Sequence, residues 1–202
     1  MPIARRSIRH NPRVLLNSTP MATDGSIHFC KREIRSQMKR RLRDLQPAQR
    51  EAKSAEICQQ IINKFANIHT VAAFASSQFE PNLETLWTRG FFVGRLVLHP
   101  KIDGNKLVFC PVASGDDLRP GQFGILEPVH APAQLTPEVV LVPGLAFTSE
   151  GHRLGRGVGF YDRFLGTSPS GVIKAGICFD FQVVPELPAE SHDVRMDLVI
   201  TG

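Results

Sequence analysis

Six short runs of apolar residues after Asn67 constrain the fold of this chain more than any other feature. Each run is bounded by Gly, Pro, Asn or Asp, and Val, Ile and Leu follow one another with little alternation with polar residues. This pattern predicts strands buried on both faces, as in a largely parallel sheet. The runs are residues 70–76, 95–99, 106–112, 138–144, 172–179 and 197–201.

Helical patterns precede and interrupt these runs. Between Ile34 and Leu45, apolar residues recur at spacings of four, four and three, the period of one helical face. A second helix is expected over residues 47–65, with its proline in the first turn, and shorter ones over 82–90 and 160–166. The sequence therefore predicts an α/β fold. We expect a three-layer, open, mostly parallel sheet with helices on both faces, preceded by an N-terminal helical pair.

The positive charge is confined to one end of the chain. The net charge is +5, but residues 31–50 hold eight basic side chains against two acidic ones, and the body after residue 50 is mildly acidic. This distribution argues against a general nucleic-acid coat. No apolar run approaches the roughly 20 residues of a membrane-spanning helix, so a membrane role is not expected either. The four cysteines are widely spaced and include no CxxC pair, which favours a reducing compartment.

Residues 1–28 contain Arg and Ser, have no acid before Asp24 and lack the apolar core of a secretory signal. We expect residues 1–28 to be a flexible or targeting-like extension and residues 29–202 to form a single α/β domain. The extension has the composition of an organellar targeting peptide, but an upstream start codon, with Met21 as the true start, would give the same pattern. We expect a cytoplasmic protein, or a mitochondrial one if residues 1–28 are a transit peptide.

The densest functional signal is the glycine-rich stretch at residues 143–163. It follows an apolar run, precedes a short helix and contains Arg153 and Arg156 among four glycines. Such a loop can turn backbone N–H groups toward phosphate oxygens. It matches neither the Walker A loop nor the GxGxxG dinucleotide motif. The alternative is a flexible surface loop whose glycines only make turns.

Other candidate residues surround this stretch in the predicted fold. Asp162 could hold Mg²⁺ beside phosphates together with Asp193 or Asp197, although an acid at a helix start also stabilises the helix. We expect His192 to be a structural neighbour rather than a metal ligand. Lys31 and Arg35 share one helical face and could reach a triphosphate, or they could belong to a solvated basic face.

Glu80 follows the first apolar run, so it lies where ligand crevices form in open α/β sheets. The alternative is that Glu80 is an ordinary turn residue before proline.

From about Lys31 to the C-terminus, the chain resembles the 5-formyltetrahydrofolate cyclo-ligase family. The segments that carry the resemblance are KREIR, FEPNLET, FGILEP, PGLAFTSEGHRLGRGVGFYDR and HDVRMDLVIT.

The resemblance implies a small monomeric α/β enzyme that uses ATP and Mg²⁺ to close 5-formyltetrahydrofolate to 5,10-methenyltetrahydrofolate, releasing ADP and phosphate. It implies Lys31 and Arg156 in catalysis and Mg²⁺ on Asp162 and Asp193. The implied ATP-binding residues are Lys31, Arg35, Arg153, Leu154, Gly155, Arg156, Gly157, Val158, Gly159, Phe160 and Tyr161. The implied substrate-binding residues are Ala75, Glu80, Arg156, Gly157, Val158, Gly159 and Phe160.

Two positions depart from the family pattern. The family usually has Gly or Lys where this chain has Val158, and Tyr where it has Phe160. Such changes bear on affinity more than on reaction type. The residue types suit phosphorylation of the formyl oxygen by ATP, because phosphoryl transfer needs positioned positive charge and no protein nucleophile.

Two other classes of function stay open at this level. One is a nucleotide- or RNA-binding module that uses the basic helix over residues 31–43 and a non-catalytic glycine loop; its binding would weaken steeply with salt. The other is a phosphosugar isomerase or acyl-CoA transferase on a similar fold, which would not need Asp162 and Asp193 for Mg²⁺. Fold alone does not decide among them.

Overall fold

A computed structural model describes residues 24–121 and 124–202. All six apolar runs form strands of one sheet, in the order β10-β9-β6-β1-β2-β3. Neighbouring strands are parallel except β3, which pairs antiparallel with β2. The mostly parallel sheet predicted from the sequence is therefore confirmed. The strands are β1 (Thr70–Ala72), β2 (Leu96–Asp103), β3 (Lys106–Pro111), β6 (Val139–Pro143), β9 (Ile173–Cys178) and β10 (Leu198–Thr201).

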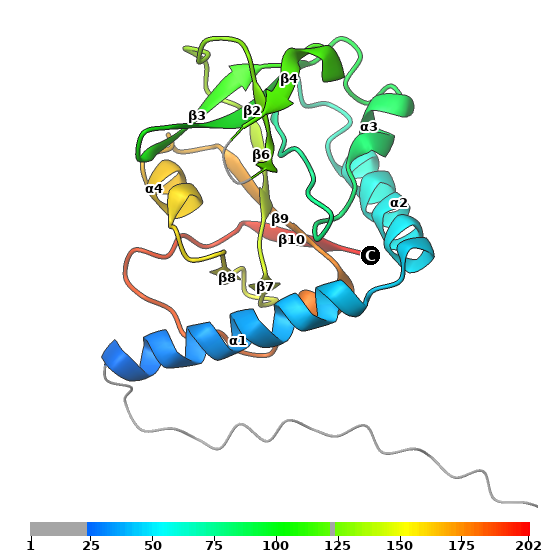
Figure 1. Ribbon diagram of the computed structural model, residues 1–202. Coiled ribbons are helices and arrows are strands. Elements are labelled where there is room, and N and C mark those ends of the chain that lie inside the picture. The colour runs from blue at the N-terminus through cyan, green and yellow to red at the C-terminus, as the bar shows by residue number, and fades with distance from the viewer. Residues whose placement is uncertain (1–23, 122–123) are drawn as a thin grey trace, which may run out of the picture.

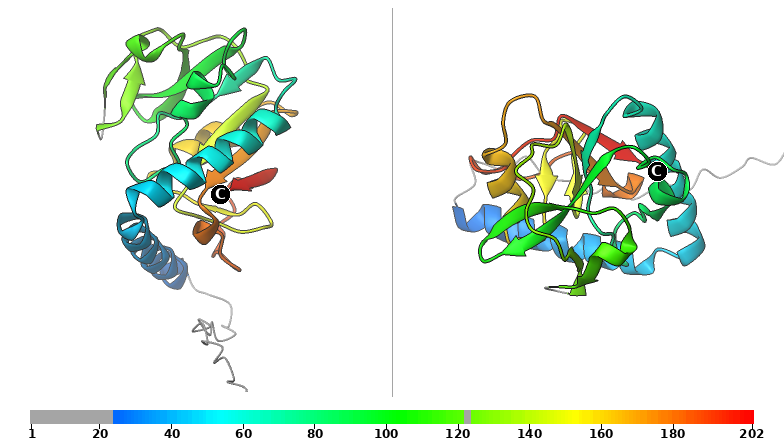
Figure 2. Two further views of the ribbon diagram at one scale, coloured as in Figure 1. Left: turned by 90° about the vertical axis from the view of Figure 1, so that its right-hand side faces the viewer. Right: turned by 90° about the horizontal axis from the view of Figure 1, so that it is seen from above.

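Helices lie on both faces of the sheet, as the sequence predicted. Helices α2 (Pro47–Lys64) and α3 (Glu84–Thr88) cover one face, and α4 (Phe160–Gly166) covers the other (Figures 1 and 2). Helix α1 (Asp24–Asp44) runs across one end of the sheet and contacts the segment that follows β6. This arrangement places α1 against one end of the strands.

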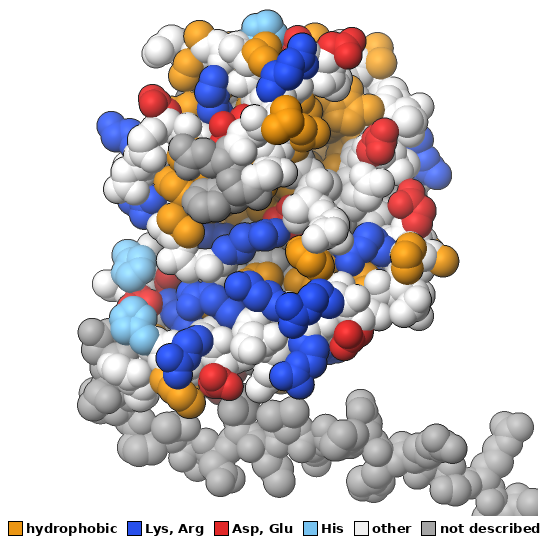
Figure 3. All heavy atoms as spheres, in the orientation of Figure 1, with side chains coloured by type: hydrophobic (Ala, Val, Ile, Leu, Met, Phe, Trp, Pro, Cys, Tyr) orange, Lys and Arg blue, Asp and Glu red, His pale blue; other side chains and the backbone are white. Residues whose placement is uncertain are grey.

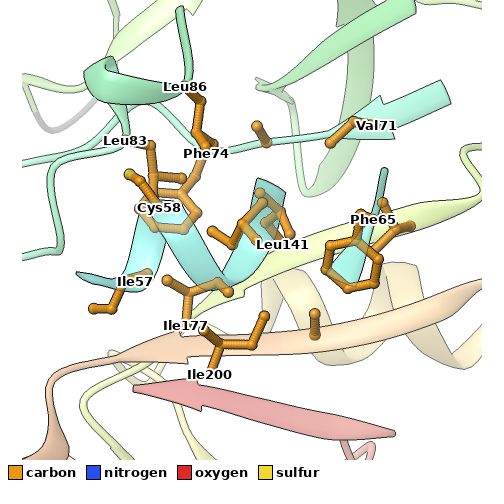
Figure 4. Packing of buried hydrophobic residues seen from close by; sticks show 14 of the residues in the cluster. Ile57, Cys58, Phe65, Val71, Phe74, Leu83, Leu86, Leu141, Ile177 and Ile200 are labelled. Carbon is orange, nitrogen blue, oxygen red and sulfur yellow. The ribbon is translucent and has the colours of Figure 1, made fainter. Parts of the chain in front are cut away.

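Burial on both faces explains why the strands lack a clean polar alternation. In β6, Leu141 packs with the α2 side, whereas Val140 and Val142 pack with the α4 side. Figure 4 shows Leu141 among side chains from α2 and from the neighbouring strands, including Ile57 and Ile177. Burying each such side chain contributes about 1.5–3 kcal/mol. A polar residue on either face of β6 would therefore be costly.

Two small hairpins were not predicted from the sequence. The first part of the stretch expected to be a long loop forms β7 (Ala146–Phe147) and β8 (Arg153–Leu154). Gly151 turns this hairpin at a φ of +88°, and a Cβ there would lie 2.2 Å from the carbonyl oxygen of Met196. The second hairpin joins β4 (Leu118–Pro120) to β5 (Leu126–Pro128). Strands of two or three residues are too short to show a period in sequence.

Other boundaries also differ from those expected. Helix α1 begins at Asp24, earlier than the boundary after residue 28, because no proline interrupts residues 24–31. The rest of the predicted extension, residues 1–23, lies outside the described part of the chain. The short 3₁₀ helices are η1 (Gly115–Asp117) and η3 (Asp180–Gln182). Among the described residues, no helix has both the length and the apolar character needed to cross a membrane.

Candidate functional site

A cavity of about 460 Å³ lies beyond the ends of β1 and β6. Its walls come from α1, from the glycine loop (residues 155–159) between β8 and α4, and from the β2–β3 and β4–β5 hairpins. Figure 3, in the orientation of Figure 1, shows a band of Lys and Arg side chains along α1. The cavity brings together all the site residues that the resemblance implies: Lys31, Arg35, Ala75, Glu80, Arg153, Leu154, Gly155, Arg156, Gly157, Val158, Gly159, Phe160, Tyr161, Asp162 and Asp193.

Helix α1 is tied to the glycine loop through Arg35. The Arg35 Nε donates a hydrogen bond to the carbonyl oxygen of Gly155 at 3.0 Å. Gly157 has a φ of +108°, and a Cβ there would lie 3.6 Å from the Arg35 guanidinium carbon. Glycine is needed here because other residues rarely adopt this backbone conformation. The loop and the basic helix thus form one wall of the cavity.

Lys31 lies between two carboxylates that close the same wall. The Lys31 side chain is 5% exposed, and its Nζ lies 2.6 Å from both Glu190 Oε2 and Asp193 Oδ2. The hydrogen bond from Lys31 lowers the pKa of Glu190. Burial would raise the pKa of Asp193, but hydrogen bonds from Lys31 and from the Glu190 N–H hold it below its usual value. The alternative that Lys31 belongs to a solvated face is therefore wrong.

The pKa of Lys31 is shifted by opposing effects. Burial lowers it, whereas hydrogen bonds and charges from Asp193 and Glu190 raise it, and the net result is a pKa above the usual value. The ammonium group is therefore fully charged at neutral pH. Glu190 was not predicted from the sequence, although it stands only three residues before Asp193.

Arg153 and Asp162 form a second ion pair in the wall. The Arg153 side chain is 4% exposed, and its Nη2 lies 2.8 Å from Asp162 Oδ2. Its Nη1 donates to the carbonyl oxygen of Pro143, and its guanidinium carbon lies 5.5 Å from the ring centre of Tyr161. Burial raises the pKa of the Tyr161 hydroxyl, so this group stays neutral. Arg153 thus joins the end of β6 to the start of α4.

Arg156 connects the glycine loop to the segment after β1. Its Nη2 donates to Ser77 Oγ and to Glu80 Oε1, both at 3.0 Å. The other carboxylate oxygen of Glu80 accepts a hydrogen bond from the Ser77 N–H at 2.9 Å. The Arg156 side chain is 44% exposed. This ion pair therefore lies at the open side of the cavity, where water screens it.

The opposite end of the cavity is mostly apolar. We call this surface the apolar wall; its residues are Pro100, Ile102, Leu107, Ile125, Val158 and Phe160. Arg163, on α4, donates to the Val158 carbonyl oxygen at 2.9 Å, and its guanidinium carbon lies 5.1 Å from the Phe160 ring centre. Both departures from the family pattern therefore fall on this wall.

The carboxylates of the site have the chemistry that Mg²⁺ prefers. In both Asp162 and Asp193, Oδ2 accepts from a basic side chain, while Oδ1 accepts no hydrogen bond from any described residue. Donor atoms of Glu190, His192 and Asp193 lie within 4.8 Å of one another. Glu190, His192 and Asp193 could hold a cation at the cavity, whereas Asp162, predicted as a ligand together with Asp193, lines the cavity outside this cluster. The alternative that Asp197 holds Mg²⁺ together with Asp162 is wrong, because Asp197 contacts Lys174 and does not line the cavity.

Comparisons with known proteins agree with this site. The model of the 5-formyltetrahydrofolate cyclo-ligase family matches residues 28–202. The 5-formyltetrahydrofolate cyclo-ligase of Mus musculus is 26% identical over 194 residues, covering 87% of this chain and 95% of its own. The Escherichia coli K12 protein of the same name is 36% identical over 147 residues, covering 66% of this chain and 78% of its own.

A solved structure has the same fold. The 5,10-methenyltetrahydrofolate synthetase of Aquifex aeolicus superposes with a TM-score of 0.74 at 31% identity, covering 85% of this chain and 89% of the other. The family match spans the whole α/β domain and every residue that lines the cavity. The chain is therefore an enzyme of the 5-formyltetrahydrofolate cyclo-ligase family.

Proposed function

We propose that this protein cyclises 5-formyltetrahydrofolate to 5,10-methenyltetrahydrofolate at the expense of ATP, with Mg²⁺, and releases ADP and phosphate. The observation that carries the proposal is the division of one cavity into two ends. One end holds three basic side chains beside the glycine loop, the other is the apolar wall, and Arg156 lies between them. Such a division suits a nucleoside triphosphate and a ring system whose faces pack on apolar side chains in the same space.

The polar end is the place we assign to ATP. Lys31, Arg35 and Arg153 provide positive charge there, and the glycine loop provides backbone N–H groups. Asp162 and Asp193, with Glu190 beside Asp193, would hold Mg²⁺, which supplies positive charge to phosphate oxygens when bound. In Asp162 and Asp193, Oδ1 accepts no hydrogen bond from any described residue, so it can face the cation while Oδ2 keeps its contact with a basic side chain.

The reaction we propose begins with transfer of the γ-phosphoryl group of ATP to the formyl oxygen. The formyl oxygen is amide-like and leaves poorly, whereas a phosphorylated oxygen leaves as phosphate. N10 of the folate attacks the formyl carbon, its proton passes to solvent, and the bond from carbon to the phosphorylated oxygen breaks. Arg156 lies between the two ends, where it can stabilise charge on the transferred group. No protein nucleophile takes part.

The test is a spectroscopic assay of purified protein. We expect near-ultraviolet absorbance of the methenyl product to appear when 5-formyltetrahydrofolate, ATP and Mg²⁺ are all present, and to be absent when any one of them is omitted. A signal without ATP would contradict the phosphoryl-transfer step. No signal with all three, although ATP raises the unfolding temperature, would contradict the assignment of the apolar wall to folate.

A further inference from the structure

One carboxylate within the apolar wall forms no ion pair with any described residue, since Arg119, opposite it in the β4–β5 ladder, donates to the carbonyl oxygens of Asp116 and Leu118 instead. Glu127, on β5, lines the cavity next to Ile102, Leu107 and Ile125 and is half-buried. Its one hydrogen bond within the described residues comes from the Ile102 N–H to Oε1, at a long 3.4 Å. It makes no ion pair with any described residue. A carboxylate held in an apolar surrounding is costly unless a ligand donates to it.

The other carboxylate near the folate end differs in this respect. Both oxygens of Glu80 are already engaged, one by Arg156 and one by the Ser77 N–H. Glu127, with one long hydrogen bond and no ion pair within the described residues, therefore has more free acceptor capacity than Glu80. Glycine at position 121 also makes room for it, because a Cβ there would lie 2.5 Å from Glu127 Oε2. The space that Glu127 occupies thus depends on the absence of a side chain at position 121.

We propose that Glu127 determines specificity for the pterin ring by accepting hydrogen bonds from its 2-amino group and N3–H. These two donors are adjacent on one edge of the ring, and a carboxylate offers two acceptor oxygens in matching geometry. The ring faces pack on the apolar wall, and the opposite edge, which carries N5 and the formyl group, faces the glycine loop. This inference rests on the proposed function.

The experiment compares Glu127→Gln and Glu127→Ala with the unchanged protein. We expect both variants to raise the KM for 5-formyltetrahydrofolate about 10- to 100-fold, the loss typical of charge-assisted hydrogen bonds, and to leave the KM for ATP within about twofold. Glu150→Gln is the matched control, because Glu150 is exposed and does not line the cavity. Gly121→Ala should raise the folate KM in the same direction by displacing the carboxylate.

A second substrate separates recognition from a structural role. A 5-formyltetrahydrofolate analogue with methyl in place of the 2-amino group should be discriminated against by the unchanged protein and not by Glu127→Ala. Equal discrimination in both proteins, with turnover intact, would overturn the inference while leaving the proposed function in place. If the unchanged protein neither turns over nor binds 5-formyltetrahydrofolate in calorimetry, the proposed function fails first. If Glu127→Ala does not fold, Glu127→Gln takes its place in the comparison, provided that its unfolding temperature equals that of the unchanged protein.

Discussion

The two ends of the cavity hold charge in different ways. At the polar end, Lys31 contacts Glu190 and Asp193, and Arg153 contacts Asp162, so each charge already has a partner. At the apolar end, Glu127 has no ion pair within the described residues. The polar end is therefore organised before any ligand binds, because its charges are already paired. The apolar end instead leaves an acceptor for a ligand to fill.

The largest effect should come from removing Arg156. Phosphoryl transfer depends on positioned positive charge, and we expect Arg156→Ala to lower kcat by about 10³-fold. Its exposed ion pair with Glu80 should contribute no more than about 1 kcal/mol to stability. Steady-state kinetics and thermal unfolding measure the two effects separately. Arg40→Ala is the control, since Arg40 is exposed on α1 and does not line the cavity. Full activity in Arg156→Ala would refute its assignment.

Removing Lys31 should break the organisation of the polar end. Lys31→Met leaves two neighbouring carboxylates without their cation, and we expect a loss of about 3 kcal/mol in the free energy of unfolding. Urea denaturation measures it. Lys53→Met is the matched control, because Lys53 forms a more exposed pair with Asp180 and should cost at most about 1 kcal/mol. Equal losses in the two variants would mean that the Lys31 cluster is not preorganised.

The pH dependence of stability should separate the polar end from the rest of the sheet. His99 on β2 is buried, and burial lowers its pKa from 6.5 to about 4. Between these values the unfolded chain binds more protons than the fold, so stability falls as pH drops from 6.5 to 4, by roughly 3 kcal/mol. The lowered pKa values of Glu190 and Asp193 act in the same direction but in a lower range: their contribution to stability is complete above pH 4.5 and is lost as pH falls further.

Urea denaturation from pH 7 to pH 3 tests these two ranges. His99→Leu should remove most of the loss between pH 6.5 and 4 without changing the loss at lower pH. Glu190→Gln should flatten only the loss below pH 4.5, and only in part, because the pKa values of Asp117 and Glu138 are also lowered. A variant that altered the other range would show that its group titrates differently in the fold.

The smallest effects should come from restoring the family residues at the apolar wall. Val158 is 51% exposed, so a new cation in Val158→Lys should change KM by no more than about fivefold, the range of exposed charge contacts. Phe160→Tyr adds one hydroxyl and should change KM less. Initial-rate kinetics with each substrate varied in turn measure both. A tenfold change in kcat would place these residues in the chemical step rather than in binding.

The sheet was readable from sequence because its strands are buried on both faces. Continuous runs of Val, Ile and Leu have few other uses in a chain of this kind. The antiparallel pairing of β3 was not predicted, although the Gly104-Asn105 turn between β2 and β3 is a typical hairpin signal. Gly104 has a φ of +58°, as such a turn requires. The turn therefore indicated an antiparallel pair locally, but the sequence analysis followed the parallel pattern of the other strands.

The polar end of the site was readable for a different reason. Its residues cluster in one glycine-rich stretch and on one helical face, so their chemistry shows in a single segment. The apolar wall comes from β2, β3, the β4–β5 turn, the glycine loop and the start of α4, and each of its side chains is ordinary in its own context. Glu127 and Glu190 gain meaning only from what surrounds them in space. Such residues require the structure to be found.

The most direct test of the central claim is to follow one oxygen atom. If the cavity places the γ-phosphate of ATP next to the formyl group of the folate, the phosphoryl group is transferred to the formyl oxygen. That oxygen must then leave as part of inorganic phosphate. The measurement uses 5-formyltetrahydrofolate labelled with ¹⁸O in the formyl group and mass spectrometry of the phosphate released. We expect each phosphate to carry one labelled oxygen. Unlabelled phosphate with the label in water would contradict transfer of the phosphoryl group to the formyl oxygen.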